Sequence, residues 1–362
     1  MQKELKTRQI CLFFIAFLPL SKIFTLPSII AKQAVEDMWL SSLLNFIIDG
    51  VVLVLLIVAM RKSNLTVYQL LEKYLGKLGS KILLFLYVIY FNIKALLPIN
   101  EQKDYVQFTL YTLMPTLAYF LPFFIVAFYL SIKRLRAIGR ISDILWFITL
   151  SGFFLLFSLS FANADFSAIL PVGARGIKNI VKGSYFSLPW FGDSLYLLFF
   201  IGEFAYKKRD GIKIAISYLL GMLCVILFMI IFYCIFTSIA FRQRFALTEI
   251  SKYTTVINNT GRLDYLGILL LLLSNLFALS LPIFFSVKLL VYVFNVKRQW
   301  IVSLIVVGLH FLISVFLSEF FFSIEHLSTT VLGVYYLLLG NILPIIFACL
   351  FIKENNREHQ KS

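Results

Sequence analysis

Residues 17–27 read Phe17-Leu18-Pro19-Leu20-Ser21-Lys22-Ile23-Phe24-Thr25-Leu26-Pro27, which places two prolines and a lysine inside the first long apolar stretch of the chain. Proline removes a backbone donor and its ring clashes with the preceding turn, so a helix through this stretch breaks near its middle. In lipid, freed backbone groups are tolerated only where they are buried in protein or line a cavity. The break therefore predicts a binding site at membrane depth.

The composition is that of an integral membrane protein. Of 362 residues, 60% are hydrophobic and only 14% are charged, which is too much apolar surface for a soluble domain of this size. About ten apolar stretches approach the ~20 residues that a bilayer core requires. We expect an all-α membrane protein with about ten transmembrane helices in a single integral membrane domain, residues 1–362. The spans are expected at about 9–31, 39–59, 82–99, 116–132, 143–162, 186–206, 212–240, 263–294, 300–320 and 329–352.

Basic residues gather at alternate connections between these spans. Of the 33 lysines and arginines, 21 lie near the chain ends or follow even-numbered spans, while the opposite connections hold 9 and the spans themselves 3. The positive-inside rule then places both termini in the cytoplasm. The net charge of +15 is therefore explained by membrane topology and does not require nucleic acid.

A second interruption lies halfway along the chain, in the sixth expected span. Residues 187–194 read Ser187-Leu188-Pro189-Trp190-Phe191-Gly192-Asp193-Ser194. Interrupted helices at corresponding positions of two halves point to a midplane site between inverted repeats. We expect a 5+5 inverted repeat, with a first repeat over about 9–162 and a second over about 186–352. The half-helix ends would offer N–H groups to an anion and C=O groups to a cation, which suits a small zwitterion such as an amino acid.

Seven short motifs occur along the chain. Each motif alone is weak evidence for a family, but their order and spacing together are specific. The motifs are Thr25-Leu26-Pro27, Asp37-Met38-Trp39-Leu40, Asp49-Gly50, Gly76-Lys77-Leu78-Gly79, Pro171-Val172-Gly173-Ala174-Arg175-Gly176-Ile177, Phe191-Gly192-Asp193 and Arg262-Leu263-Asp264. With these motifs, nearly the whole chain resembles the spore germination permease-like family. These proteins are the B subunits of nutrient germinant receptors in spore-forming bacteria and belong to the amino acid-polyamine-cation transporter superfamily.

The resemblance implies a LeuT-like transporter fold of ten helices, with broken first and sixth helices, that senses a nutrient rather than, or in addition to, moving it. It implies a place in the spore inner membrane, or the bacterial cell membrane. It also implies an A-type membrane subunit and a C-type lipoprotein as partners, and a small nutrient such as an amino acid as ligand. No cofactor and no metal are expected.

The two breaks supply the residues that we expect to bind the ligand. These are Pro19, Leu20, Ser21 and Lys22 in the first break, and Trp190, Phe191, Gly192 and Asp193 in the second. Lys22 departs from the family, which often has a small, glycine-containing stretch at this place. Three roles are open for it: it neutralises a ligand carboxylate or Asp193, it fills a cation position, or it closes the amino-acid pocket.

Three other ionisable residues lie within the expected spans, where a charge costs ~2.5 to 3.5 kcal/mol even on the mild insertion scale. Asp49 has either a coupling role or a structural one, in which it braces Lys22 or Lys288. Lys94 and Lys288 are likewise candidates for a coupling or structural role. Because both lie within one to two turns of a span end, snorkelling to the interface is the alternative for each.

The polar stretch 100–114 is expected to be a connecting loop with a surface helix. Residues 65–76 start with a Thr cap and run to Gly76, which predicts an amphipathic helix along the inner interface.

Two further functions remain open. One is a secondary amino acid permease coupled to H+ or Na+, and the other is a receptor assembly scaffold with a vestigial pocket. An enzyme is not expected, because the chain has no GxSxG, GxxxxGK[ST] or HExxH motif and no paired His and Asp cluster in a loop.

Overall fold

The fold is a bundle of helices, seen in a computed structural model that describes residues 5–61, 65–109, 116–204, 206–207, 209–252, 264–316 and 320–361. Within this part of the chain, seven segments are long and apolar enough to cross a membrane. They are Leu26–Met60, Val67–Gln107, Leu135–Asn163, Asp210–Arg242, Ile268–Phe294, Gln299–Phe316 and Gly333–Glu354. The all-α membrane architecture is confirmed, while the count of ten helices and the inverted repeat stay predictions.

The first broken helix follows the prolines. Helix α1 (Thr7–Phe17) ends just before Pro19, a 3-10 turn η1 covers Leu20–Lys22, and α2 (Leu26–Ala34) resumes with Pro27 in its first turn. Proline is tolerated there because the first N–H groups of a helix have no partner within the helix.

The second broken helix has the same construction. Helix α7 (Ile177–Ser187) leads into the 3-10 turn η5 (Leu188–Trp190), and α8 (Leu195–Phe200) follows after a short non-helical segment that contains Gly192 at φ +83°. Helix α2 packs against α7. At the other end of the two helices, the Leu5 amide donates to the Glu203 carbonyl at 3.1 Å. The two broken helices are therefore neighbours at both of their ends.

Helix α4 (Val67–Thr109) is two helices joined at Gly76, whose φ of +69° is outside the helical range. The expected interfacial helix from Thr66 to Gly76 is the first of them, and the side chains of Thr66 and Gln69 cap its start reciprocally. The second helix continues past the expected span end. The assignment of 100–114 to a connecting loop with a surface helix was therefore wrong for 100–106, which are buried and continue the spanning helix. Residues 107–109 are also helical, and 110–115 lie outside the described residues.

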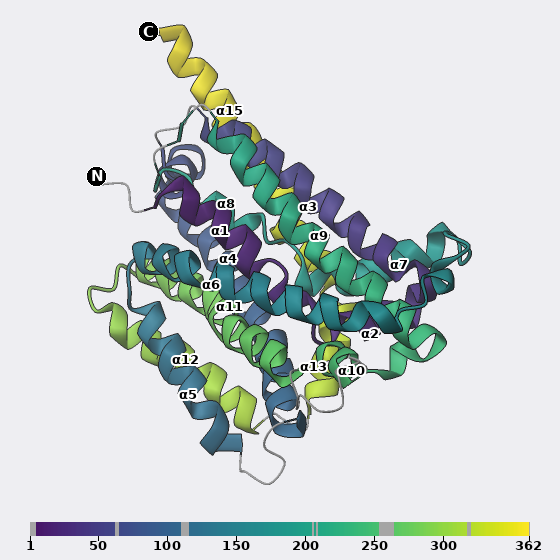
Figure 1. The fold of residues 1–362 in the computed structure, drawn as a ribbon. Helices are drawn as coiled ribbons and strands as arrows, with labels where there is room; N and C mark the ends of the chain where they lie inside the picture. Colours follow the sequence, from purple (N-terminus) through teal and green to yellow (C-terminus); the bar gives the residue numbers. More distant parts are fainter. Residues whose placement is uncertain are drawn as a thin grey trace.

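The remaining elements surround the two broken helices, with α4 and α11 packed against each other (Figure 1). Helices α5, α11 and α12 share a second, smaller core with the middle of α4, and α5 and α12 lie side by side in Figure 1. The longer elements are α3 (Met38–Met60), α5 (Thr116–Ser131), α6 (Leu135–Ser160), α9 (Asp210–Phe236), α11 (Asp264–Phe294), α12 (Gln299–Phe316) and α15 (Leu343–Lys361). The shorter ones are η2 (Val35–Asp37), η3 (Phe161–Asn163), η4 (Phe166–Ile169), η6 (Thr237–Arg242), α10 (Ala246–Lys252), α13 (Phe321–Thr330), α14 (Gly333–Leu337) and the π-helix η8 (Leu338–Ile342).

Two glycines allow the second break to approach the π-helix. A Cβ added to Gly340 would lie 2.9 Å from the Tyr90 hydroxyl oxygen, and one added to Gly192 would lie 3.1 Å from the same oxygen and 3.6 Å from the Gly340 Cα. The contact therefore requires the absence of a side chain at Gly340, and it holds the non-helical segment of the second break against α4 and η8.

We expect Gly340→Ala to destabilise the protein by ~1 to 3 kcal/mol, since an added methyl group overpacks this contact. Thermal unfolding of the purified protein measures the effect. Gly308→Ala in α12 is the matched control, because nothing lies within 4 Å of its added Cβ; it should be neutral or stabilising by up to ~1 kcal/mol. Equal unfolding temperatures for the two variants would contradict the role of this contact.

Candidate functional site

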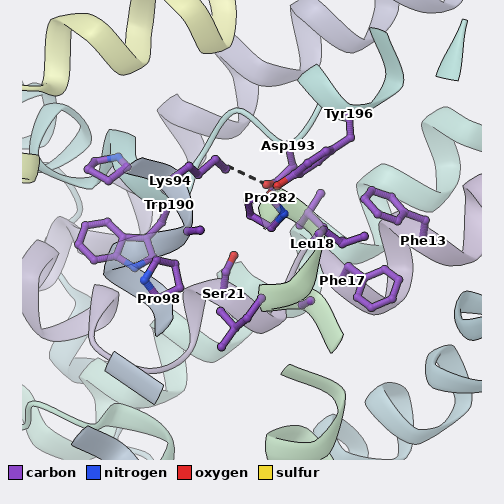
Figure 2. A pocket seen from close by; sticks show the side chains of 15 residues that line it. Phe13, Phe17, Leu18, Ser21, Lys94, Pro98, Trp190, Asp193, Tyr196 and Pro282 are labelled. Carbon is purple, nitrogen blue, oxygen red and sulfur yellow. Dashed lines mark ion pairs between the residues drawn. The ribbon is translucent and has the colours of Figure 1, made fainter. Parts of the chain in front are cut away.

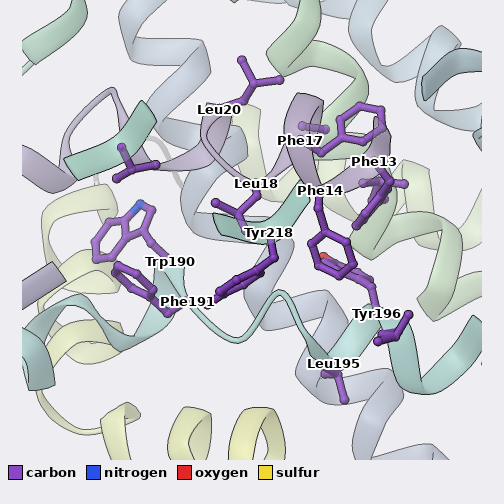
Figure 3. Close-up of a cluster of buried hydrophobic side chains, with 14 of the residues drawn as sticks. Phe13, Phe14, Phe17, Leu18, Leu20, Trp190, Phe191, Leu195, Tyr196 and Tyr218 are labelled. Carbon is purple, nitrogen blue, oxygen red and sulfur yellow. The ribbon is translucent and has the colours of Figure 1, made fainter. Parts of the chain in front are cut away.

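A small cavity lies between the two helix breaks (Figure 2). Its volume is about 40 Å³, which leaves room for water but not for an amino acid. Most of its wall is apolar, and three of its residues are prolines that interrupt or bound helices on three different segments, Pro98, Pro189 and Pro282. Around it is an aromatic core in which the ring of Tyr196 lies 5.7 Å from that of Phe13, between centroids (Figure 3). The space between the breaks is thus narrow and mostly filled by side chains.

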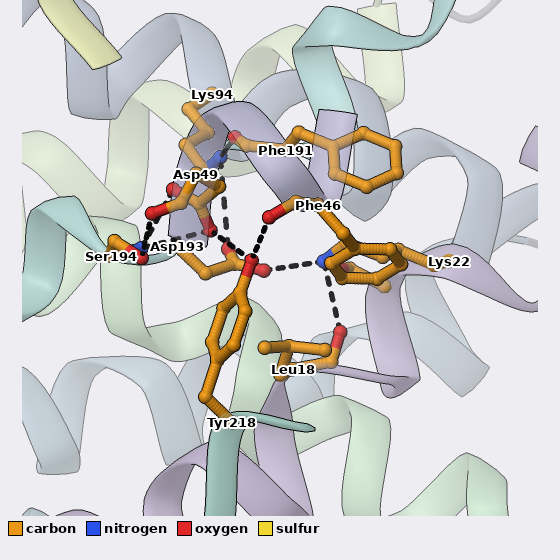
Figure 4. Close-up of polar contacts among 10 residues, drawn as sticks. Leu18, Lys22, Phe46, Asp49, Lys94, Phe191, Asp193, Ser194 and Tyr218 are labelled. Carbon is orange, nitrogen blue, oxygen red and sulfur yellow. Dashed lines mark hydrogen bonds and ion pairs between the residues drawn. The ribbon is translucent and has the colours of Figure 1, made fainter. Parts of the chain in front are cut away.

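An ion pair joins the two breaks. The Lys22 ammonium donates to Asp193 Oδ2, to the Leu18 carbonyl at 2.9 Å and to Ser21 Oγ at 3.4 Å (Figure 4). The Lys22 side chain is fully buried, with 0% of its surface exposed. The same ammonium lies 5.3 Å from the centre of the Phe191 ring, within the range of a cation–π contact. The two residues expected to face one another from separate breaks are therefore in direct contact.

Lys94 on α4 also binds the second break. Its ammonium donates to the Phe191 carbonyl and lies 3.9 Å from Asp193 Oδ1. With 6% of its surface exposed, Lys94 does not snorkel to the interface, and the prediction that allowed this was wrong. Lys288 is more exposed, and its ammonium lies 5.1 Å from the centre of the Phe284 ring on its own helix.

Asp49 on α3 is bound by neutral donors. Its carboxylate accepts from the Ser194 amide at 3.2 Å and from the Tyr218 hydroxyl at 3.3 Å, and Ser194 Oγ donates to the Asp49 carbonyl at 2.9 Å. No direct ion pair with Lys22 is present among the described contacts, so the expected bracing of Lys22 is indirect, through Ser194 next to Asp193. Asp49 thereby attaches α3 to the start of α8.

Glu101 is a site residue that the sequence analysis missed. Its carboxyl group accepts from the Thr25 hydroxyl at the first break and from the Trp190 indole N–H at the second, the latter at 3.3 Å. Residues 100–104 read Asn-Glu-Gln-Lys-Asp and are all buried, although their composition is typical of a loop. The signal that was available is the absence of Gly or Pro from 99 to 107, which permits the helix to continue.

A second set of contacts lies one turn farther along α4. Arg244 contacts Asp104 at 3.3 Å and Glu325 of α13 at 4.0 Å, and its guanidinium carbon lies 4.5 Å from the centre of the Phe322 ring. Burial raises the pKa of the Glu325 carboxyl, against the opposing effect of Arg244. Together with Glu101, these contacts close one end of the space between the breaks.

Of the eight expected ligand-binding residues, three line the cavity, namely Ser21, Trp190 and Asp193. Lys22 and Phe191 do not line it but contact charged groups that do, Asp193 and Lys94 respectively. Gly192 faces Tyr90 and Gly340. Pro19 and Leu20 are buried but do not line the cavity; the Pro19 carbonyl accepts the Lys22 amide at 3.0 Å. The cavity is also lined by Lys94, which was expected only as a coupling or structural charge. Its other lining residues were not expected at the site, namely Phe13, Phe17, Leu18, Ala95, Pro98, Pro189, Tyr196, Ala278, Leu279, Leu281 and Pro282.

A helical membrane fold with two broken helices around a buried polar site defines the class, a permease-type integral membrane protein. The sequence matches the family described as spore germination protein over residues 4–323. The chain therefore belongs to this family, as its motifs had indicated. No curated protein sequence matches it significantly.

The fold is similar to that of a solved transporter. The Eremococcus coleocola manganese transporter, determined in complex with an aromatic bis-isothiourea substituted compound, superposes with a TM-score of 0.58. The two proteins are 12% identical in sequence, and the match covers 94% of this chain and 78% of the other. At this identity the likeness establishes the fold alone.

We expect removal of one partner of the Lys22–Asp193 pair to cost ~3 to 5 kcal/mol of stability, because the other charge is then buried without a counterion. Lys22→Met and Asp193→Asn each remove one partner, and the double variant should be more stable than either single one. Thermal unfolding of the three proteins measures the coupling. Arg8→Ala is the control, since Arg8 is 70% exposed in its pair with Asp143 and such pairs contribute ~0 to 1 kcal/mol. Additive losses in the double variant would show that the pair is not coupled.

Proposed function

We propose that this protein is the nutrient-sensing membrane subunit of a spore germinant receptor. The observation that carries the proposal is a small cavity between two broken helices in a chain of the spore germination protein family. The ligand is a small nutrient, similar to an amino acid, and binds at the membrane midplane among Ser21, Trp190 and Asp193.

The cavity supports a ligand with both polar and apolar parts. Lys94 and Asp193 contribute charged groups to its wall, and Phe17, Trp190 and Tyr196 contribute aromatic rings. The volume of about 40 Å³ is too small for such a ligand, so binding needs a conformation in which the cavity is wider. A ligand shifts the population toward that conformation only through its differential affinity for it. In a sensor, partner proteins respond to this change in the population of the wider conformation.

The closed end of the site suggests the direction of ligand entry. Glu101 ties Thr25 to Trp190, and Arg244 bridges Asp104 and Glu325 beyond it. The hydrogen bonds of Glu101 and the ion pairs of Arg244 must both break for a ligand to enter from this end. The distribution of basic residues supports placing this end outside and both termini on the cytoplasmic, or spore core, side. The proposed partners are an A-type membrane subunit and a C-type lipoprotein in the spore inner membrane.

We expect Asp193→Ala to raise the nutrient concentration needed for germination roughly tenfold or more, since a lost hydrogen bond to a charged group costs ~1.5 to 3 kcal/mol. Spores carrying the variant are compared with wild-type spores over a range of amino acids, with protein levels measured by immunoblot. Arg8→Ala is the matched control and should respond normally. An unchanged response at a normal protein level would favour the assembly scaffold with a vestigial pocket.

A separate experiment distinguishes the sensor from an amino acid permease. Purified protein in proteoliposomes should bind a germinant amino acid but should not concentrate it under a H+ or Na+ gradient. Uptake of the radiolabelled amino acid measures transport, and binding to the same protein in detergent measures recognition. Concentrative uptake that Asp193→Ala abolishes would replace the sensor with a coupled permease.

A further inference from the structure

Oxygen atoms surround the Lys22 ammonium as they would surround a small inorganic cation. Its three partners are a main-chain carbonyl at the break (Leu18), a hydroxyl (Ser21) and a carboxylate (Asp193). Oxygen ligands of these types are those that hard cations take in proteins, and unwound helix carbonyls are known to coordinate Na+ in membrane transporters. In this chain the ammonium group of the Lys22 side chain lies among these three oxygen atoms.

A second ammonium repeats the arrangement at the other break. Lys94 donates to the Phe191 carbonyl, which lies in the non-helical segment before α8, and its Nζ lies 3.9 Å from Asp193 Oδ1. Asp193 therefore faces one lysine with each of its oxygens. At the first break, the Leu18 carbonyl accepts from Lys22 of the same break. At the second break, the Phe191 carbonyl accepts from Lys94 of α4.

The charges of this cluster balance without an added ion. Lys22 and Lys94 bring two ammonium groups, and Asp49 and Asp193 bring two carboxyl groups, so the ionised forms of the four side chains cancel. The Asp49 carboxylate already accepts hydrogen bonds from the Ser194 amide and the Tyr218 hydroxyl. A metal cation entering here would give the buried cluster a net positive charge and would find its oxygen ligands occupied, which is unfavourable at membrane depth.

We propose that the ammonium groups of Lys22 and Lys94 fill the cation positions of the two helix breaks, so that the protein assembles its site without a co-bound Na+ or other inorganic cation. Lys22 then combines two of the roles that were open for it, since it neutralises Asp193 and also fills a cation position. This arrangement does not depend on which nutrient binds, nor on whether the protein senses or transports it.

Thermal unfolding in different salts tests the proposal with the metal ion alone as the probe. Wild-type protein is unfolded in NaCl and in choline chloride at equal ionic strength, and its midpoint should be the same in both. Lys22→Met removes the ammonium and leaves its oxygen ligands, so its midpoint should rise with Na+ concentration and not with choline. Lys22→Met/Asp193→Asn removes the carboxylate as well and should lose this dependence.

A matched control and a second variant complete the experiment. Lys133→Met removes a lysine that packs over the Tyr129 ring outside the cluster, and should behave as wild type. If Lys22→Met does not fold, Lys94→Met is measured in the same way and should also gain Na+ dependence. Specific stabilisation of the wild type by Na+ would overturn the proposal, as would folded lysine variants that do not distinguish Na+ from choline. Because no nutrient is present, these results are independent of the germination and uptake experiments.

Discussion

The need to satisfy polar groups of two broken helices inside a membrane governs this structure. Hydrocarbon offers no partner for the backbone exposed at Pro19 and Pro189, so the partners must come from the protein. Lys22 and Asp193 supply them together: the lysine binds a carbonyl of its own break, and the aspartate of the other break neutralises it. Lys94, Asp49 and the surrounding aromatic rings are arranged around this pair.

Local chemistry made the breaks predictable. Proline acts on its own helix, and Gly76 ends its helix for a similarly local reason, so both were found from the residue types alone. The contact of Lys22 with Asp193 was expected because a charge at membrane depth needs a partner and the two breaks correspond in position. The family was recognised from short motifs whose order is preserved, and the match over residues 4–323 agrees with it.

Residue types alone did not predict which face of a helix is buried or which distant segments it contacts. Lys94 lies near enough to a helix end to snorkel, but the side of α4 that carries it faces the second break, and sequence position does not reveal the facing side. Residues 100–104 are polar enough for a loop, yet they are buried because neighbouring helices surround α4 there. The contacts of Arg244 join three segments far apart in sequence, and no local pattern contains that information.

The hydrogen bond between the Leu5 amide and the Glu203 carbonyl has a mechanical consequence. It fastens the beginning of the first broken helix to the chain just beyond the second, across two segments that are otherwise separated by half the sequence. Leu5 and Phe204 also pair as an isolated parallel β-bridge at this place. The two segments therefore either move together here or break this pairing.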